Sequence, residues 1–336
     1  MGRRKYTLPR HTNVSNQGPR IGAFLIDLAI AFAITLIFFF GVFRFVFNFK
    51  TAPLEKRIRE ERISSHLFYE DENGKLDYFD YESENEPFIQ DLKYFYCVYI
   101  PAQNPDNAGD FTIEWFNKNV LQIEGDGKAY FEYDGGNKDV VGIIKTDANK
   151  EDVNKYLQNE WMKAAYNLNQ LPSFRKLNNE FAFFNTLEFV ISGLIATTVT
   201  YVIIPICFKD GTTVGKKVFG LCLADSDGYK MRNSQLAMRV MPIDVLLLAL
   251  LIPIWNTIWV VLVVYVVVFL VSFALAMASP KRSSLHDFTA RTIVVNARTS
   301  ILFETSADEE EYTRKEDNGE LIIEDKGEEP ELRYEK

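Results

Sequence analysis

Five charged residues lie within or beside the apolar segments of this 336-residue chain, and their types could support ion chemistry. They are Arg20, Asp27, Arg239, Asp244 and Asp287. An ionised side chain in hydrocarbon costs about 3 kcal/mol or more, so each must contact protein, water or an opposite charge. A carboxylate with a raised pKa can exchange a proton for a cation, which makes Asp27 a candidate carrier or ligand. The alternative is a structural network of ion pairs that fixes the first apolar segment in place.

The spacing of Arg20 and Asp27 indicates where their partners must come from. Seven positions separate them, so in a helix they share one face, two turns apart. This separation is too long for an easy direct pair, and we expect each residue to find its partner elsewhere in the chain. Asp27 is also only about 9 Å along the helix from Ile21, where the apolar run begins, which is shallow enough for interfacial water to reach it.

Other chemistries fit the chain less well. The loop 211–217 has two glycines four residues apart followed by two lysines, whereas a phosphate-binding loop needs GxxxxGK[ST] after a strand. We expect these lysines to contact anionic lipid headgroups instead. The predicted headgroup contacts are Lys216, Lys217, Lys281 and Arg282.

No constellation of nucleophile and base is evident, so an enzyme is not expected. His286 precedes Asp287, but no second histidine lies nearby, and the spacing of the three cysteines indicates neither a zinc site nor a disulfide framework. The sequence therefore predicts no metal and no cofactor.

Three apolar segments define the expected elements. Ile21–Phe43 and Phe189–Phe208 are each long enough to cross a hydrocarbon core of about 30 Å as one helix. Met241–Ser279 contains one charge, Asp244, and is too long for one span but sufficient for two, with a break at Pro253–Asn256. The sequence predicts an all-α polytopic membrane domain of four spans, the last two forming a hairpin. A re-entrant first arm is the alternative for 241–254.

The charges are segregated along the chain. Lys and Arg outnumber acids in residues 1–50, seven to one, and acids outnumber Lys and Arg in residues 51–182, 25 to 15. Because Lys and Arg near spans stay on the cytoplasmic side, we expect the N-terminus, the loop 209–239 and the segment 280–298 to be cytoplasmic. Four spans satisfy all three. The expected location is a cell membrane, with both termini cytoplasmic.

The segment 51–182 is too polar to span and long enough for an α+β extracytoplasmic domain. Helices are predicted at Leu54–Leu67 and Glu151–Leu168 from their apolar periodicity. Strands are predicted at four aromatic-rich stretches: Leu76–Tyr81, Tyr94–Ile100, Lys128–Tyr133 and Val140–Lys145. The acidic, aromatic stretch 69–81 could bind calcium or a cationic partner, but it lacks the EF-hand spacing and is better explained as a solvated face.

Two short strands, at 218–224 and 292–296, are expected to form a cytoplasmic pair. The acidic tail is predicted to be disordered. The expected domains are a basic N-terminus at 1–17, a membrane domain at 18–50 and 183–300, the insertion at 51–182 and the tail at 301–336.

Four motifs in this order resemble the RDD family of membrane proteins. They are R20-I-G-A-F-L-I-D27, the loop from Asp210 to Gly228 with its Gly-Lys-Lys and Gly-Leu elements, Arg239, and K281-R-S-S-L-H-D287. The resemblance implies that Arg20, Asp27 and Asp287 are the arginine and two aspartates that name the family. It covers roughly 18–47 and 185–297, and the long insertion departs from it. Family members have been linked to transport, including sodium/proton exchange.

Two functions follow as hypotheses. The first is transport of a cation or other small solute, with a homo-oligomer as the expected assembly because four spans alone make a thin pathway. The second is a non-catalytic membrane scaffold or assembly factor that binds a protein partner through residues 51–182 and the acidic tail. The lipid bilayer is a partner in both, and nucleic acid in neither.

Overall fold

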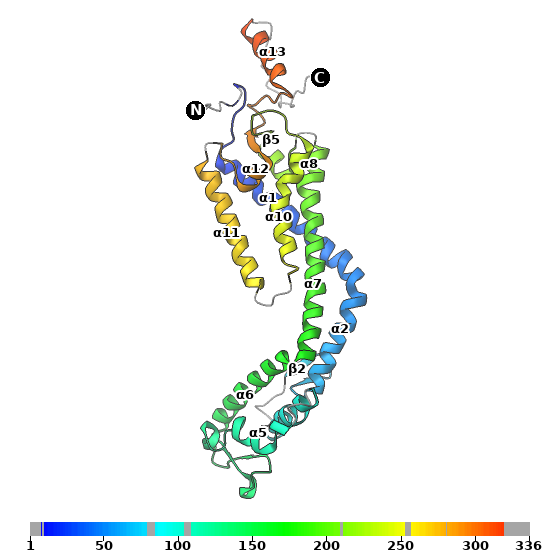
Figure 1. The fold of residues 1–336 in the computed structure, drawn as a ribbon, viewed down its shortest axis with the longest axis vertical. Helices are drawn as coiled ribbons and strands as arrows, with labels where there is room; N and C mark the ends of the chain where they lie inside the picture. The colour runs from blue at the N-terminus through cyan, green and yellow to red at the C-terminus, as the bar shows by residue number, and fades with distance from the viewer. Residues whose placement is uncertain are drawn as a thin grey trace. The chain divides into compact units, whose positions relative to one another are not determined.

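The computed structural model describes residues 8, 10–78, 85–103, 109–208, 211–252, 257–279 and 281–318. It divides into two compact units (Figure 1). The first contains residues 1–47 and 186–336, and the second contains residues 48–185. The predicted insertion, 51–182, differs from the second unit by three residues at each end.

The first unit is built mainly from helices. Among the described residues, the two helices Gln17–Ser64 and Pro172–Cys207 are long and apolar enough to cross a membrane, by length and composition. Each contains a π-helical segment. The predicted break at Pro253–Asn256 lies outside the described residues. Up to residue 290, the described helical elements wholly within this unit are α1 (Gln17–Leu36), η1 (Ile37–Phe43), η6 (Val199–Ile203), α8 (Ile204–Cys207), α9 (Val214–Val218), α10 (Asn233–Ala249), α11 (Thr257–Ala278) and α12 (Leu285–Ala290). Two further helices, α2 (Arg44–Ser64) and α7 (Pro172–Thr198), are shared with the second unit.

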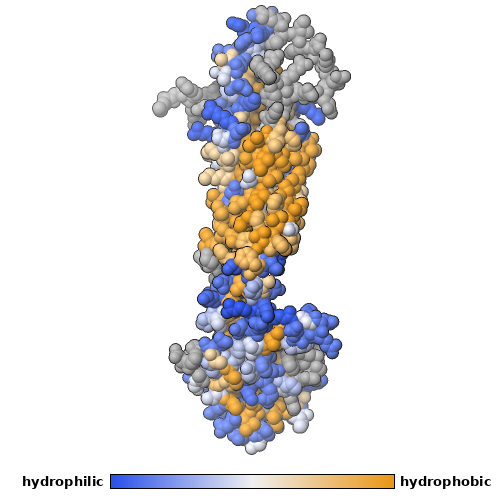
Figure 2. Space-filling model, turned by 90° about the vertical axis from the view of Figure 1, so that its right-hand side faces the viewer, coloured by the Kyte–Doolittle hydropathy of each residue, from blue (hydrophilic) through white to orange (hydrophobic). Residues whose placement is uncertain are grey.

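The outer surface of these helices is apolar. Figure 2 shows a broad band of hydrophobic side chains over the helical part of the first unit. Large apolar side chains are exposed on these helices, among them Leu25 and Phe32 of α1 (57% and 59% exposed) and Phe269 of α11 (56% exposed). A patch of this extent is far larger than soluble monomers usually expose, and it fits contact with lipid.

A short sheet brings together three segments of the first unit that are far apart in the sequence. Strand β5 (Leu221–Asp225) pairs antiparallel with β6 (Thr292–Asn296), so the expected strand pair is present. The N-terminal segment adds to β6 through a bridge between Val14 and Val295 and a hydrogen bond from the Asn296 N–H to the Asn13 carbonyl. Both faces of the strand pair are buried, which explains the continuous apolar run in each strand.

The start of the acidic tail is helical rather than disordered. The helix α13 (Ser306–Asp317) begins at Thr305, whose hydroxyl and backbone N–H both donate to the Asp308 carboxylate. Tyr312 on α13 packs against Phe303 and His11 at ring distances of 5.2 and 5.4 Å. The expectation of disorder is therefore wrong for 306–317, because composition does not reveal this cap and aromatic contact. Residues 319–336, with a possible strand at Leu321–Ile323, lie outside the described residues.

The second unit has a largely helical core. The predicted strand at Tyr94–Ile100 is wrong: it is helical, because Leu92, Phe95, Tyr96 and Tyr99 are buried at helical spacing. The two predicted helices are present as parts of α2 and α6, and the strands are two small hairpins. The elements are β1 (Phe68–Glu70), β2 (Leu76–Tyr78), α3 (Asn85–Tyr94), η2 (Phe95–Tyr99), α4 (Ile100–Gln103), α5 (Ile113–Asn119), η4 (Asp126–Ala129), β3 (Phe131–Glu132), η5 (Asp134–Gly136), β4 (Ile143–Ile144) and α6 (Lys150–Gln170).

Candidate functional site: a buried charge cluster in the first unit

Asp27 is buried and held by neutral donors of the short helix α9. Its side chain faces the start of α9, where Thr213 Oγ1 donates to Asp27 Oδ2 at 2.5 Å and the Gly215 N–H donates to Asp27 Oδ1 at 2.8 Å. Asp27 is only 2% exposed. Asp27 is therefore paired with a helix N-terminus and not with an arginine. Free N–H groups at a helix N-terminus stabilise a carboxylate.

The local sequence explains why α9 presents these donors. Thr213 is the N-cap of α9, and its hydroxyl oxygen accepts a hydrogen bond from the Lys216 N–H. Gly215 allows the close approach, because a Cβ at this position would lie 2.2 Å from the Ala23 carbonyl oxygen. The pattern Thr-Val-Gly after a glycine turn is the signal that could have indicated this contact.

The variant Asp27→Asn is expected to lower the free energy of unfolding by about 2 kcal/mol, since the amide offers one acceptor where two donors converge in a buried place. The measurement is thermal unfolding in detergent. Thr213→Val should cost less than Asp27→Asn, because it removes one donor and leaves the Gly215 contact intact. An unchanged melting temperature for Asp27→Asn would show that the contacts to α9 contribute little.

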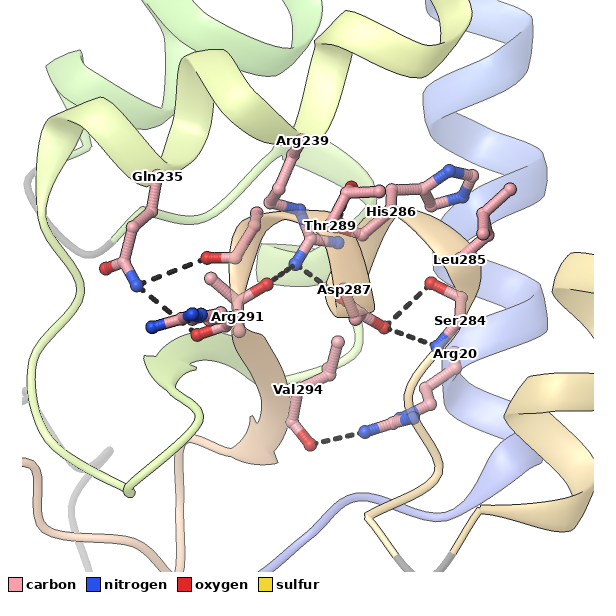
Figure 3. Close-up of polar contacts among 12 residues, drawn as sticks. Arg20, Gln235, Arg239, Ser284, Leu285, His286, Asp287, Thr289, Arg291 and Val294 are labelled. Atoms are coloured by element: carbon pink, nitrogen blue, oxygen red, sulfur yellow. Dashed lines mark hydrogen bonds and ion pairs between the residues drawn. The ribbon is translucent and has the colours of Figure 1, made fainter.

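The second half of the cluster is an ion pair between Arg239 on α10 and Asp287 on α12 (Figure 3). Arg239 Nη1 lies 2.5 Å from Asp287 Oδ1 and also donates to Thr292 Oγ1 at 2.7 Å. Asp287 Oδ2 accepts from the Ser284 N–H at 3.0 Å and from the Ser284 hydroxyl at 2.8 Å. Asp287 therefore closes the first turn of α12 and ties that helix to α10.

Arg20 reaches the same region from α1. Its guanidinium donates to the Arg282 carbonyl and, at 2.6 Å, to the Val294 carbonyl of β6. Arg20 and Asp287 also interact electrostatically. The structure thus brings Arg20, Arg239 and Asp287 together from three distant parts of the sequence, and the partners of Arg20 are mainly backbone carbonyls.

The pKa values of the ionisable groups around the ion pair are shifted by burial and by the neighbouring cations. Burial opposes ionisation of Asp287, but the Arg239 guanidinium and the Ser284 hydrogen bonds hold its pKa below the usual range. Burial, followed by the charge of Arg239, lowers the pKa of His286 to about 4 and that of Lys216 to about 7. His286 is therefore neutral at neutral pH. The cluster contains more cationic side chains than carboxylates, so several cations share few counter-ions.

Asp244 does not join this cluster by any contact among the described residues. Its Oδ1 accepts a hydrogen bond from Thr197 Oγ1 of α7 at 2.8 Å. Glu188, also on α7, is a buried carboxylate that immediately precedes the apolar segment Phe189–Phe208. Its side chain is fully buried, the nearest cation is Arg44 Nη1 at 4.0 Å, and neither carboxylate oxygen has a hydrogen-bond partner among the described residues.

The residues predicted to contact lipid headgroups have roles inside the unit. Lys281 Nζ donates to the Ser226 carbonyl at 2.5 Å, and Arg282 Nη1 donates to the Ser15 carbonyl and to Asn16 Oδ1 at 3.1 and 2.9 Å. Lys217 Nζ lies 4.4 Å from the ring centre of Phe208. The charges of Asp27 and Asp287 both act to raise the pKa of Lys216, against the larger effects of burial and Arg239. The sequence did not distinguish these intramolecular contacts from lipid contacts.

Chemically, the cluster can fasten helices together more readily than it can exchange ions in this conformation. Asp27 accepts two hydrogen bonds, and Asp287 accepts two hydrogen bonds and an ion pair. No group of three or more His, Cys, Asp or Glu residues able to hold a metal ion occurs among the residues the structure describes.

The apolar helices and their buried charges define a helical membrane protein. Comparison with known families supports the resemblance: the model of the RDD family matches residues 160–291, which is consistent with an RDD family protein. The match contains Arg239, Asp244 and Asp287, while Arg20 and Asp27 precede it. No curated protein and no solved structure matches the chain.

Proposed function

We propose that the chain is a multi-pass membrane protein that acts as a scaffold, with the charge cluster as a structural joint and residues 48–185 as the part displayed to partners. Four spans, formed by α1, α7, α10 and α11, would put both termini on the cytoplasmic side and the displayed unit on the opposite side. The basic residues near 209–239 and 280–298 support this orientation. α10 and α11 flank the short connection 250–256 and support the predicted hairpin.

One observation carries the scaffold proposal: Asp27, the best-placed carboxylate for ion exchange, is 2% exposed and has both oxygens occupied by donors of α9. A carboxylate that accepts two short hydrogen bonds from the fold would have to lose both before it could bind a cation. This requirement favours a structural role, in which α9 and the sheet are fastened to α1.

A second candidate function, cation or proton transport, is favoured by Glu188. A fully buried carboxylate that accepts no hydrogen bond from the residues the structure describes, in a helix that is apolar enough to span, is the kind of group that marks ion pathways. Ser192, one turn further along α7, is buried on the same face. Transport would then use the face of α7 that carries Glu188.

Reconstitution into liposomes with an imposed pH gradient tests the two functions. For a scaffold we expect no sodium-coupled proton flux above that of empty liposomes. Flux that is abolished by Glu188→Gln but unaffected by Glu180→Gln, an exposed carboxylate on the same helix, would overturn the scaffold proposal in favour of transport. If Asp27→Asn abolishes the flux without changing stability, Asp27 takes part directly in ion transport.

Cysteine labelling tests the topology. In a cysteine-free background, Lys118→Cys should react with a membrane-impermeant maleimide from outside intact cells, and Asn318→Cys only after permeabilisation. Both positions are exposed. Labelling of both from the same side would contradict the four-span arrangement.

A further inference from the structure

The second unit contains a cleft of about 670 Å³, a volume typical of ligand sites. It lies between α6 on one side and η2 and α5 on the other. Its walls combine aromatic rings, amides and one acidic residue. The lining residues are Tyr96, Trp115, Asn119, Val120, Asn159, Glu160, Met162, Lys163, Tyr166 and Asn167.

The aromatic residues differ in how deeply they are placed. Tyr96 is 4% exposed, and its hydroxyl accepts a hydrogen bond from Asn167 Nδ2 at 3.3 Å. Trp115 is half-buried, with its ring centre 5.7 Å from that of Tyr96, whereas Tyr166 is 65% exposed. Two rings therefore form part of the wall, and a third stands exposed beside it. Aromatic faces of this kind attract cations.

The acidic residue in the cleft is a buried carboxylate that already pairs with a cation of the lining. The Glu160 side chain is 5% exposed, and its Oε1 lies 2.6 Å from Lys163 Nζ, one turn along α6. The Lys163 side chain is 59% exposed, so it reaches Glu160 from solvent and can leave without uncovering other buried groups. Burial raises the pKa of Glu160, and the contact with Lys163 partly offsets this rise.

We propose that this cleft binds an alkylammonium group, with Glu160 as its counter-ion, Tyr96 and Trp115 as the aromatic wall, and Lys163 as an internal occupant that the ligand displaces. The acids of residues 51–182 outnumber Lys and Arg by 25 to 15, and this negative field raises the local concentration of cations. The site lies wholly within the second unit. It can therefore be tested apart from both the scaffold and the transport function.

Calorimetric titration of the full-length protein in detergent tests the proposal with three probes. These are n-butylammonium, its neutral counterpart 1-butanol, and a short peptide with one lysine and blocked ends. Both ammonium probes should bind and butanol should not. Peptide binding at least tenfold tighter than butylammonium would identify a protein segment as the source of the group, and equal affinity would identify a free amine. Butanol binding as tight as that of butylammonium would overturn the proposal.

Two variants separate ligand binding from a merely structural ion pair. Lys163→Ala should tighten butylammonium binding severalfold, because it removes the internal competitor at an exposed helix position. Glu160→Gln should weaken it at least tenfold. Lys155→Ala, an exposed lysine of α6 outside the cleft, is the matched control and should leave the affinity unchanged. Weaker binding after Lys163→Ala would contradict the proposed displacement, and this result does not depend on whether Glu160→Gln folds.

Discussion

The variant Arg239→Met is expected to lower the free energy of unfolding by about 3–5 kcal/mol, because it leaves the buried carboxylate of Asp287 without its counter-ion. The Arg239 side chain is 12% exposed and that of Asp287 3%, so water cannot replace the lost guanidinium at little cost. The hydrogen bond to Thr292 of β6 is lost as well. The measurement is thermal or denaturant unfolding of the purified protein in detergent, followed by tryptophan fluorescence.

The double variant Arg239→Met/Asp287→Asn separates loss of the charge pair from loss of packing. Removing the orphaned charge should recover part of the stability, so that the double variant is more stable than Arg239→Met alone. Arg298→Met, at an exposed arginine that follows β6, is the control and should change stability by less than about 0.5 kcal/mol. If Arg239→Met and Arg298→Met behave alike, the ion pair does not hold α10 to α12.

The variant Gly215→Ala is expected to destabilise the first unit by about 3 kcal/mol, the upper end of overpacking effects. The added methyl would lie 2.2 Å from the Ala23 carbonyl oxygen and 2.9 Å from Asp27 Oδ1. Backbone atoms of α1 cannot move aside without disturbing that helix, so α9 must withdraw. Withdrawal also breaks the Gly215 hydrogen bond to Asp27. Reduced melting temperature and increased proteolysis near 211–220 are the expected readouts.

Gly18→Ala is the matched control for this substitution. Gly18 lies in the first turn of α1, and a Cβ there would meet no atom within 4 Å. Because alanine favours helix over glycine by up to about 1 kcal/mol, this variant should be unchanged or slightly more stable. Equal stability of Gly215→Ala and the wild type would show that α9 is not packed on α1 as described.

These variants bear on function as well as stability. If the cluster is a joint, Gly215→Ala and Arg239→Met should loosen the membrane unit without changing ligand binding to the cleft of the second unit, since the two sites lie in separate units. Loss of alkylammonium binding in either variant would indicate that the units are coupled.

The local sequence pattern predicted the long helices correctly, but it predicted the strands of the second unit less well. The helix α6 follows from its apolar periodicity, and α1 from its long apolar run. The stretch 94–100 instead combines β-favouring aromatics with a helical burial pattern, and burial decided its conformation. The tail helix α13 was not predicted, because the acidic composition of the tail indicates disorder and its one helix-start signal, the N-cap Thr305, is weak by comparison.

The sequence by itself determined that Arg20 and Asp27 need partners, because an apolar run cannot solvate them. It could not determine which partners, because those of Asp27 lie 186 and 188 positions away and nothing in the local pattern encodes such pairings. The tertiary structure decided that Asp27 receives uncharged donors from α9 and that Asp287 receives the arginine. The physical reason is geometric: because residue 215 has no Cβ, the N-terminus of α9 can approach α1 closely enough for the Gly215 N–H to reach Asp27.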